Sequence, residues 1–155
     1  MAGVSTDPRR DVGHEVGRDP GREVGPDPRR AVGPSPRRDL GQLGEQLASE
    51  HLERRGFTIV ERNYRTRWGE LDVIAFDGTT LAFCEVKTRR AGGRAGAPFE
   101  SLGRGKQAQV RRMAARWLVE RRDRPHADQI RFDAIGVTFD GAWRLVALEH
   151  LENAF

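Results

Sequence analysis

The chain has 155 residues, a length that suits one domain with a tail, and its hydrophobic content of 37% is low for a chain that folds throughout. Its formal net charge is +4 and its sequence pI is about 10.1, a balance that permits a polyanionic partner. One cysteine excludes a disulfide framework within the chain. No apolar run or signal-peptide pattern indicates a membrane span or export, so we expect a cytoplasmic protein.

Residues 1–38 contain short repeats rich in proline, glycine and arginine. The repeated units are DPRRDVG, DPGREVG, DPRRAVG and SPRRDLG, each with one Val or Leu. So little apolar surface cannot offset the entropy lost when a chain becomes ordered. We therefore expect a disordered tail at residues 1–38 and one folded domain at residues 39–155.

The first helix is expected over Leu40–Arg55, with Asp39 as its N-cap and Gly56 as its stop. Glu45 projects from the border of the apolar stripe of this helix. Its carboxylate either reaches past the sheet edge toward the following strands or remains a solvated helix charge. His51 lies within the stripe and is interpreted as a packing residue.

A strand over residues 57–64 leads into the basic loop Arg65-Thr66-Arg67-Trp68. Two arginines beside an aromatic side chain could hold a phosphate backbone. The alternative is an edge loop with ordinary solubilising charges.

The segment Gly69–Lys87 is predicted to be a hairpin of two strands around an Asp-Gly turn. A four-residue loop would place Asp72 opposite Glu85, whereas a two-residue loop would place Glu70 there. Either register gathers carboxylates and Lys87 on one face. Carboxylates held so close favour a hard cation such as Mg²⁺ or Mn²⁺. The alternative is the solvated face of a two-sided hairpin.

Lysine is rare in this chain, which supports a chemical role for the hairpin. Of 27 basic residues, only Lys87 and Lys106 are lysine. Arginine cannot deprotonate or act as a compact point charge, whereas lysine can do both. Cys84 lies on the opposite strand face from Glu85 and is interpreted as a buried structural thiol.

A glycine-rich, arginine-containing loop over residues 88–105 follows the hairpin and would suit substrate entry. The second helix is expected over residues 106–122. Its apolar stripe, extended backwards by one turn, reaches Lys106 and Gln107, at the helix end whose dipole favours anions.

Two strands complete the expected domain. Gln129–Phe139 is predicted to be a strand in which Arg131 and Asp133 form a structural ion pair, and a last strand is expected over residues 143–148. The order of helix, three strands, helix and two strands predicts a mixed α/β domain with one sheet.

Three segments resemble the YraN family of uncharacterised bacterial proteins. They are GEQLASEHLERRGFTIVERNYRTRWGELDVIA, CEVKTRR and RFDAIGV, and the resemblance covers the chain from Leu40 onward. That family resembles Holliday-junction resolvases and the PD-(D/E)xK, restriction-endonuclease-like nucleases. The resemblance implies an αβββαβ core, a metal-dependent nuclease and a homodimer. Leu71 stands where the superfamily has its proline.

The resemblance also implies roles for individual residues. Asp72 and Glu85 would be ligands of Mg²⁺ or Mn²⁺, Glu45 would complete the site, and Lys87 would orient or help to deprotonate the attacking water. Gln107 matches a polar helix residue that related nucleases place near the site.

Nucleic-acid contacts are expected from Arg65, Arg67, Lys106 and Gln107. The first hypothesis is accordingly a nuclease that hydrolyses phosphodiester bonds in structured or branched DNA. The alternatives are a nucleic-acid-binding protein of the same fold without independent activity, and an adaptor domain whose hairpin charges form an ion-pair network.

Overall fold

A computed structural model describes residues 36–92, 99 and 102–155 of this chain. These residues belong to one compact unit that spans residues 34–155. The expected disordered tail lies outside the described residues, apart from its last three positions, which belong to the first helix. Residues 93–98, 100 and 101 of the expected entry loop also lie outside them, whereas its first residues belong to β3, which runs to Arg90.

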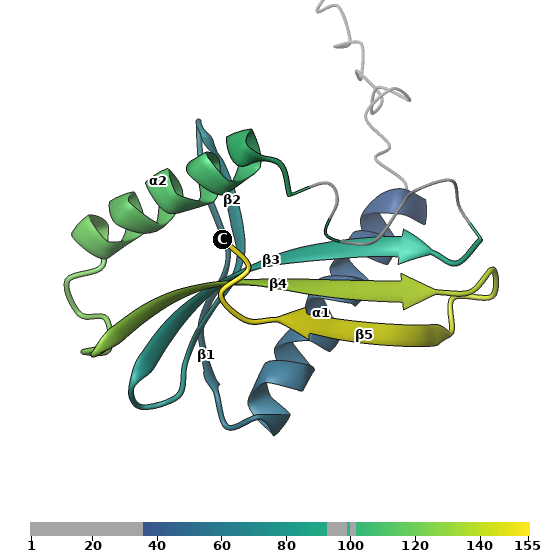
Figure 1. The fold of residues 1–155 in the computed structure, drawn as a ribbon, viewed down its shortest axis with the longest axis horizontal. Coiled ribbons are helices and arrows are strands. Elements are labelled where there is room, and N and C mark those ends of the chain that lie inside the picture. Colours follow the sequence, from purple (N-terminus) through teal and green to yellow (C-terminus); the bar gives the residue numbers. More distant parts are fainter. Residues whose placement is uncertain (1–35, 93–98, 100–101) are drawn as a thin grey trace, which may run out of the picture. The chain divides into compact units, whose positions relative to one another are not determined.

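The elements follow the order expected from the sequence (Figure 1). They form a five-stranded sheet in the order β1-β2-β3-β4-β5, in which β3 and β4 are parallel and the other neighbours are antiparallel. The mixed α/β fold with a single sheet is therefore confirmed. The bounds are α1 Pro36–Arg54, β1 Thr58–Thr66, β2 Gly69–Phe76, β3 Thr80–Arg90, α2 Arg104–Glu120, β4 Gln129–Phe139 and β5 Leu145–Leu151.

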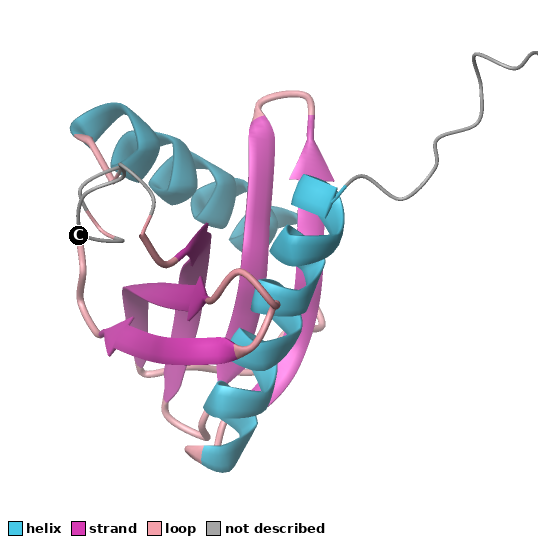
Figure 2. Ribbon diagram, turned by 90° about the vertical axis from the view of Figure 1, so that its right-hand side faces the viewer, coloured by secondary structure: helices cyan, strands magenta, loops and turns pink. Residues whose placement is uncertain are grey.

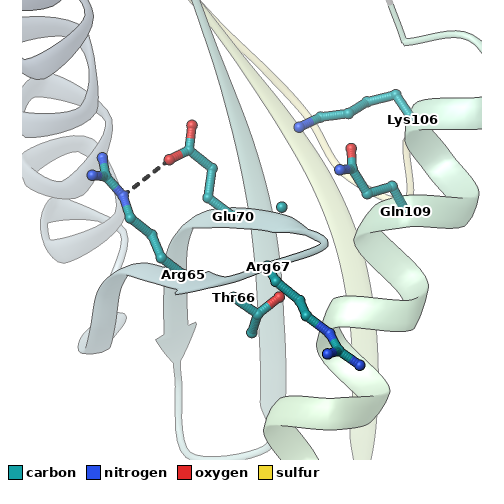
Figure 3. A pocket seen from close by; sticks show the side chains of 7 residues that line it. Arg65, Thr66, Arg67, Glu70, Lys106 and Gln109 are labelled. Carbon is teal, nitrogen blue, oxygen red and sulfur yellow. Dashed lines mark ion pairs between the residues drawn. The ribbon is translucent and has the colours of Figure 1, made fainter.

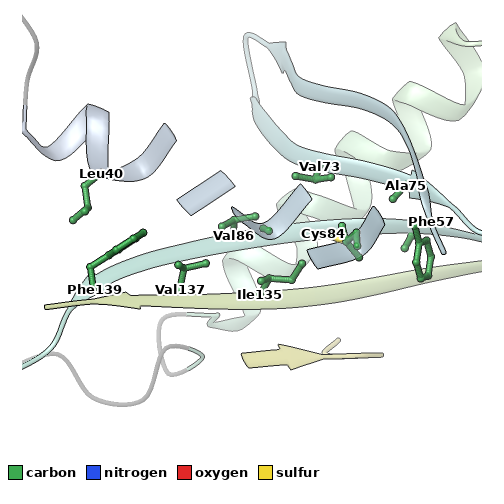
Figure 4. Packing of buried hydrophobic residues seen from close by; sticks show 12 residues of the cluster. Leu40, Phe57, Val73, Ala75, Cys84, Val86, Ile135, Val137 and Phe139 are labelled. Atoms are coloured by element: carbon green, nitrogen blue, oxygen red, sulfur yellow. The ribbon is translucent and has the colours of Figure 1, made fainter. Parts of the chain in front are cut away.

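One helix covers each face of the sheet (Figures 1 and 2), because each face buries its own apolar cluster. On one face, Leu40 of α1 packs with residues of β2, β3 and β4 (Figure 4). Ala48 and Leu52 of α1 belong to the same cluster. On the other, Met113 and Trp117 of α2 pack with Phe83 and its neighbours. No helix in the described part of the chain is both long and apolar enough to cross a membrane.

Helix α1 begins at Pro36, earlier than the expected start at Leu40. The prediction of Asp39 as N-cap is therefore wrong, and Asp39 lies in the first helical turn. A proline suits a helix start because its missing N–H needs no partner there. The expected stop is confirmed, since Gly56 has a φ of 89° and donates its N–H to the Glu53 carbonyl.

The later boundaries differ by only a few residues. Strand β4 has the expected bounds, and α2 begins two residues before the expected start, at Arg104. Strand β5 begins later than expected, at Leu145, because the preceding turn is longer. The Asp140 carboxylate holds that turn by accepting N–H bonds from Ala142 and Arg144, and Trp143 has a φ of 66°.

Candidate active site

The turn between β2 and β3 fixes which carboxylates face each other. Oδ1 of Asp77 accepts the N–H groups of Thr79 and Thr80 at 2.9 and 2.7 Å. Strands β2 and β3 pair across a four-residue loop, and their pairing extends as far as Val73 opposite Cys84. Continued by one residue, this register places Asp72 opposite Glu85, as the four-residue alternative predicted, and sets Glu70 apart.

The Glu85 carboxylate is the most deeply buried charge on this hairpin, with 2% of the residue exposed. Its Oε1 receives two ammonium groups, Lys87 Nζ at 2.8 Å and Lys106 Nζ at 2.9 Å. Its Oε2 is buried and accepts no hydrogen bond from any residue that the structure describes. An orphaned carboxylate oxygen of this kind costs free energy unless a cation or ligand group occupies the neighbouring position.

The Asp72 carboxyl group is 6% exposed and accepts the backbone N–H of Val86 at 2.7 Å through Oδ2. Burial, followed by repulsion from Glu85, raises the pKa of Asp72 from its ordinary value of 3.8 to about 7. The Val86 N–H and Lys106 oppose this rise, and Glu45 adds to it. Asp72 therefore changes its protonation state near neutral pH.

Helix α1 brings the third predicted carboxylate, Glu45, toward this hairpin. A Cβ atom at the neighbouring Gly44 would collide with the Thr88 side chain, so only glycine lets the helix approach β3 this closely. Glu45 Oε2 accepts a hydrogen bond of 2.9 Å from the Asn63 amide. Repulsion from the Glu45 carboxylate also contributes to the raised pKa of Asp72.

Asn63 was not predicted from the sequence. It stands across from Asp72 on β1, because its neighbours pair with the neighbours of Asp72. Its φ of 54° lies in the left-handed region, which asparagine enters more readily than most residues. An asparagine within a strand pattern was the available signal, but its link to Glu45 depends on tertiary structure.

The carboxylates suit a hard cation only as a partial ligand set. Within the described ranges, no three His, Cys, Asp or Glu side chains are gathered in a way that would hold a metal ion by themselves. Asp72 and Glu85 offer oxygen donors, and the buried Glu85 Oε2 accepts no hydrogen bond from the described residues. Mg²⁺ is commonly held by one or two carboxylates together with water and substrate phosphate, so these two residues fit such an ion.

The predicted nucleic-acid contacts divide between two settings, of which Figure 3 shows the first, a pocket. Arg65, Arg67 and Lys106 line an open pocket of about 490 Å³ between the β1–β2 turn and the start of α2. Arg65 Nε pairs with the Glu70 carboxylate at 3.1 Å. Gln107 does not line this pocket, because its amide donates to the Leu102 carbonyl at 2.8 Å.

Lys106 connects this pocket to the carboxylates, since it lines the pocket and pairs with Glu85. Gln109, which the sequence did not single out, lines the same pocket and donates to the Trp68 carbonyl at 2.6 Å. Its position one turn after the start of α2 was the only sequence signal for it.

Two other groups of titratable side chains lie away from these carboxylates. The expected ion pair of Arg131 and Asp133 is confirmed, at 2.9 Å. Asp133 also accepts from His150 Nε2 at 2.9 Å, and His150 Nδ1 lies 3.3 Å from His51 Nε2. Cys84 is buried, and burial raises the pKa of its thiol well above the ordinary value, as suits a structural cysteine.

Comparison with known proteins places the chain in a family. Residues 44–137 match the family model described as uncharacterised protein family UPF0102. A UPF0102 protein of Frankia alni is 47% identical over 75% of this chain and 93% of its own length. One from Geobacter metallireducens is 43% identical over 75% of this chain and 91% of its own length. The chain therefore belongs to family UPF0102, the YraN family that its motifs predicted.

Proposed function

We propose that this protein is a metal-dependent nuclease that hydrolyses phosphodiester bonds in structured or branched DNA. The carrying observation is the arrangement around Glu85, whose Oε1 binds Lys87 and Lys106 while its buried Oε2 accepts no hydrogen bond within the described part of the chain. An adaptor surface gains nothing from burying this oxygen, whereas a site that receives a cation needs it.

The raised pKa of Asp72 supports the same proposal. Two buried carboxylates that repel each other store electrostatic free energy, and a divalent cation between them would relieve it. A fold that only needed stability could have placed an apolar or amide side chain at this position. Sites that violate the rules of stable packing are expected where function requires them.

Each residue then has a chemical task. Asp72 and Glu85 would hold Mg²⁺ or Mn²⁺, with Glu45 in support through Asn63. A bound ion of this kind supplies a Lewis acid for the phosphodiester group and for water. Lys87 Nζ would orient the attacking water or hydrogen-bond a phosphate oxygen and offset its negative charge. Cleavage takes place at phosphorus, so no base contact is needed for the chemistry itself.

The DNA would lie along the basic surface next to Lys106. Arg65, Arg67 and Lys106 line an open pocket that adjoins the carboxylates through Lys106, so phosphate contacts can begin where the cation sits. We include a cytoplasmic location in this proposal, because branched DNA arises there in bacteria. A homodimer would present two such sites to the two strands of a junction.

A second candidate is nucleic-acid binding without catalysis. Two observations favour it: both ammonium groups already neutralise Glu85, and the described residues hold no complete three-carboxylate metal set. Under this alternative the lysines act as permanent counterions of Glu85 and the basic pocket alone contacts nucleic acid.

Incubation of the full chain with four-way-junction, single-stranded and duplex DNA in Mn²⁺ tests the proposal. We expect cleavage by the wild type, none in EDTA, and a loss of at least a hundredfold in Lys87→Ala. Calorimetry with Mn²⁺ should show binding that disappears in Asp72→Ala. Equal cleavage by the wild type and Lys87→Ala would identify a contaminant. Junction binding in Ca²⁺ without cleavage in Mn²⁺ would favour the second candidate.

A further inference from the structure

The Trp68 indole at the β1–β2 turn is a large aromatic ring left half in water, with 49% of the residue exposed. Two guanidinium groups lie over it, Arg67 at 4.2 Å and Arg116 at 4.6 Å from the ring centroid. Such cation–π contacts hold the guanidinium groups in place, and Arg116 Nε also pairs with Glu120 Oε1 at 2.7 Å.

The turn that carries this indole is anchored to α2. The backbone N–H of Trp68 donates to Thr66 Oγ1 at 3.1 Å, and the backbone carbonyl of Trp68 accepts from Gln109 Nε2 at 2.6 Å. The next residue, Gly69, has a φ of 146°, and a Cβ there would collide with the Gln109 side chain. The ring is thus held in a defined place rather than left on a free loop.

A slot lies between this ring and α2. It has a volume of about 320 Å³ and is lined by Trp68, Arg112, Met113 and Arg116. An aromatic face, a thioether and the aliphatic stems of two arginines suit a flat ring that can stack. The guanidinium groups at its rim suit anionic groups attached to that ring.

The slot is continuous with the candidate active site through shared residues. A second pocket, of about 540 Å³, shares Trp68 and Arg116 with the slot, and it shares Arg65 and Arg67 with the pocket that contains Lys106. Five cationic side chains and two carboxylates line these three pockets, and three of the cations are paired, Arg65 with Glu70, Arg116 with Glu120 and Lys106 with Glu85. The cations are Arg65, Arg67, Lys106, Arg112 and Arg116, and the carboxylates are Glu70 and Glu120.

The length of this path sets the scale of its ligand. Lys106 and Arg116 are separated by about 15 Å along the axis of α2, at 1.5 Å per residue. That length corresponds to about four stacked nucleotides at 3.4 Å each. A strand whose phosphate lies at Lys106 would therefore bring a base to the slot within about four nucleotides.

We propose that the slot of Trp68, Arg112, Met113 and Arg116 binds an unpaired nucleobase of a nucleic-acid strand whose phosphates lie along Arg67, Arg116 and Lys106. In a duplex the base faces are stacked and hidden, so the slot selects substrates with a single-stranded segment beside the cleaved bond. The inference rests on the proposed function, which brings nucleic acid to this face, and it narrows the substrate to DNA with unpaired nucleotides at a branch.

Fluorescence anisotropy in EDTA tests the slot without any metal. The probes are a labelled thymidine decamer, a decamer of abasic nucleotides and a ten-base-pair duplex. The wild type should bind the thymidine decamer roughly tenfold more tightly than the abasic decamer. Trp68→Ala should remove this preference and weaken binding of the other two probes less, through the arginines that pack on the ring. Trp68→Phe, which can still stack, should retain most of the preference.

Arg116→Ala should weaken binding of all three probes and reduce the slope of log affinity against log salt by about 1. The matched control is Arg122→Ala, an exposed arginine just after α2 that lines none of the three pockets. Thermal melting checks that each variant is folded.

Equal wild-type affinity for the thymidine and abasic decamers would overturn the inference, as would an unchanged preference in folded Trp68→Ala. The same experiments distinguish a failure of this inference from a failure of the proposed function. Cleavage that needs Lys87 but not Trp68 would support the nuclease and refute the slot. Binding that needs Trp68, with no cleavage in Mn²⁺, would support the slot and refute the nuclease.

Discussion

Replacing Asp72 by asparagine should stabilise the protein at alkaline pH and remove its affinity for divalent metal. Asparagine keeps an oxygen that can accept the Val86 N–H. Its amide N–H can donate to Glu85 Oε2, which has no hydrogen-bond partner among the residues of the structure that are described. The substitution therefore removes a buried repulsion and satisfies an orphaned oxygen, while it deletes the charge that a cation would need.

The size of the effect follows from the pKa of Asp72, which lies at about 7 instead of 3.8. At about 1.4 kcal/mol per pH unit, this rise corresponds to about 4 kcal/mol. Because the repulsion is shared with Glu85, we expect about 2–4 kcal/mol for the variant. The folded state holds its proton more tightly than the unfolded state. The wild type therefore loses stability as pH rises from about 4 to 7, and its deficit is complete above 7.

Urea denaturation in EDTA at pH 4.5 and pH 8 measures this effect as the difference between Asp72→Asn and the wild type. The difference should be below about 1 kcal/mol at pH 4.5 and reach its full value at pH 8. Asp123→Asn, at an exposed position after α2, is the control and should show no such pH dependence. Added Mg²⁺ should then stabilise the wild type at pH 8 but not the variant.

If the difference in unfolding free energy between Asp72→Asn and the wild type does not depend on pH, the assignment of a raised pKa to Asp72 is refuted. A variant less stable than the wild type at pH 8 would show that the Asp72 charge is an asset to the fold. Either result would remove the main electrostatic support for a cation site.

Three further outcomes are expected. Gly44→Ala should destabilise the protein by about 1–3 kcal/mol in urea denaturation, because its Cβ would collide with Thr88. Gly41→Ala on the same helix is the control, because its Cβ meets no atom, and it should stabilise the protein by about 0.5–1 kcal/mol. Equal effects of Gly44→Ala and Gly41→Ala on stability would contradict the close approach of α1 to β3. Burial and neighbouring cationic groups lower the pKa of His51, so the wild type should lose stability, relative to His51→Gln, as pH falls below about 6.5; parallel pH profiles would contradict this. Cys84 should not react with a thiol reagent under native conditions but should react fully in denaturant, and native labelling would place it at the surface.

The sequence by itself determined the element order and the heart of the candidate site. Strand β4 has its expected bounds because a run of β-formers between turn residues carries that information locally. The Asp77 turn fixes the register of β2 against β3 through hydrogen bonds within four residues, which are local in the sequence. The register that places Asp72 opposite Glu85 was therefore one of the two that the sequence predicted. Glycine at position 56 likewise ended α1 where expected.

Tertiary structure alone decided which distant residues join that hairpin. Lys106 reaches Glu85 from α2, and Asn63 contacts Glu45 between a strand and a helix. The slot at Trp68 depends on how α2 lies against the β1–β2 turn. These contacts follow from the packing of both helices on a twisted sheet, where small shifts change side-chain partners. Periodicity along one element assigns a face to a side chain, but it does not identify the neighbour that the side chain will meet.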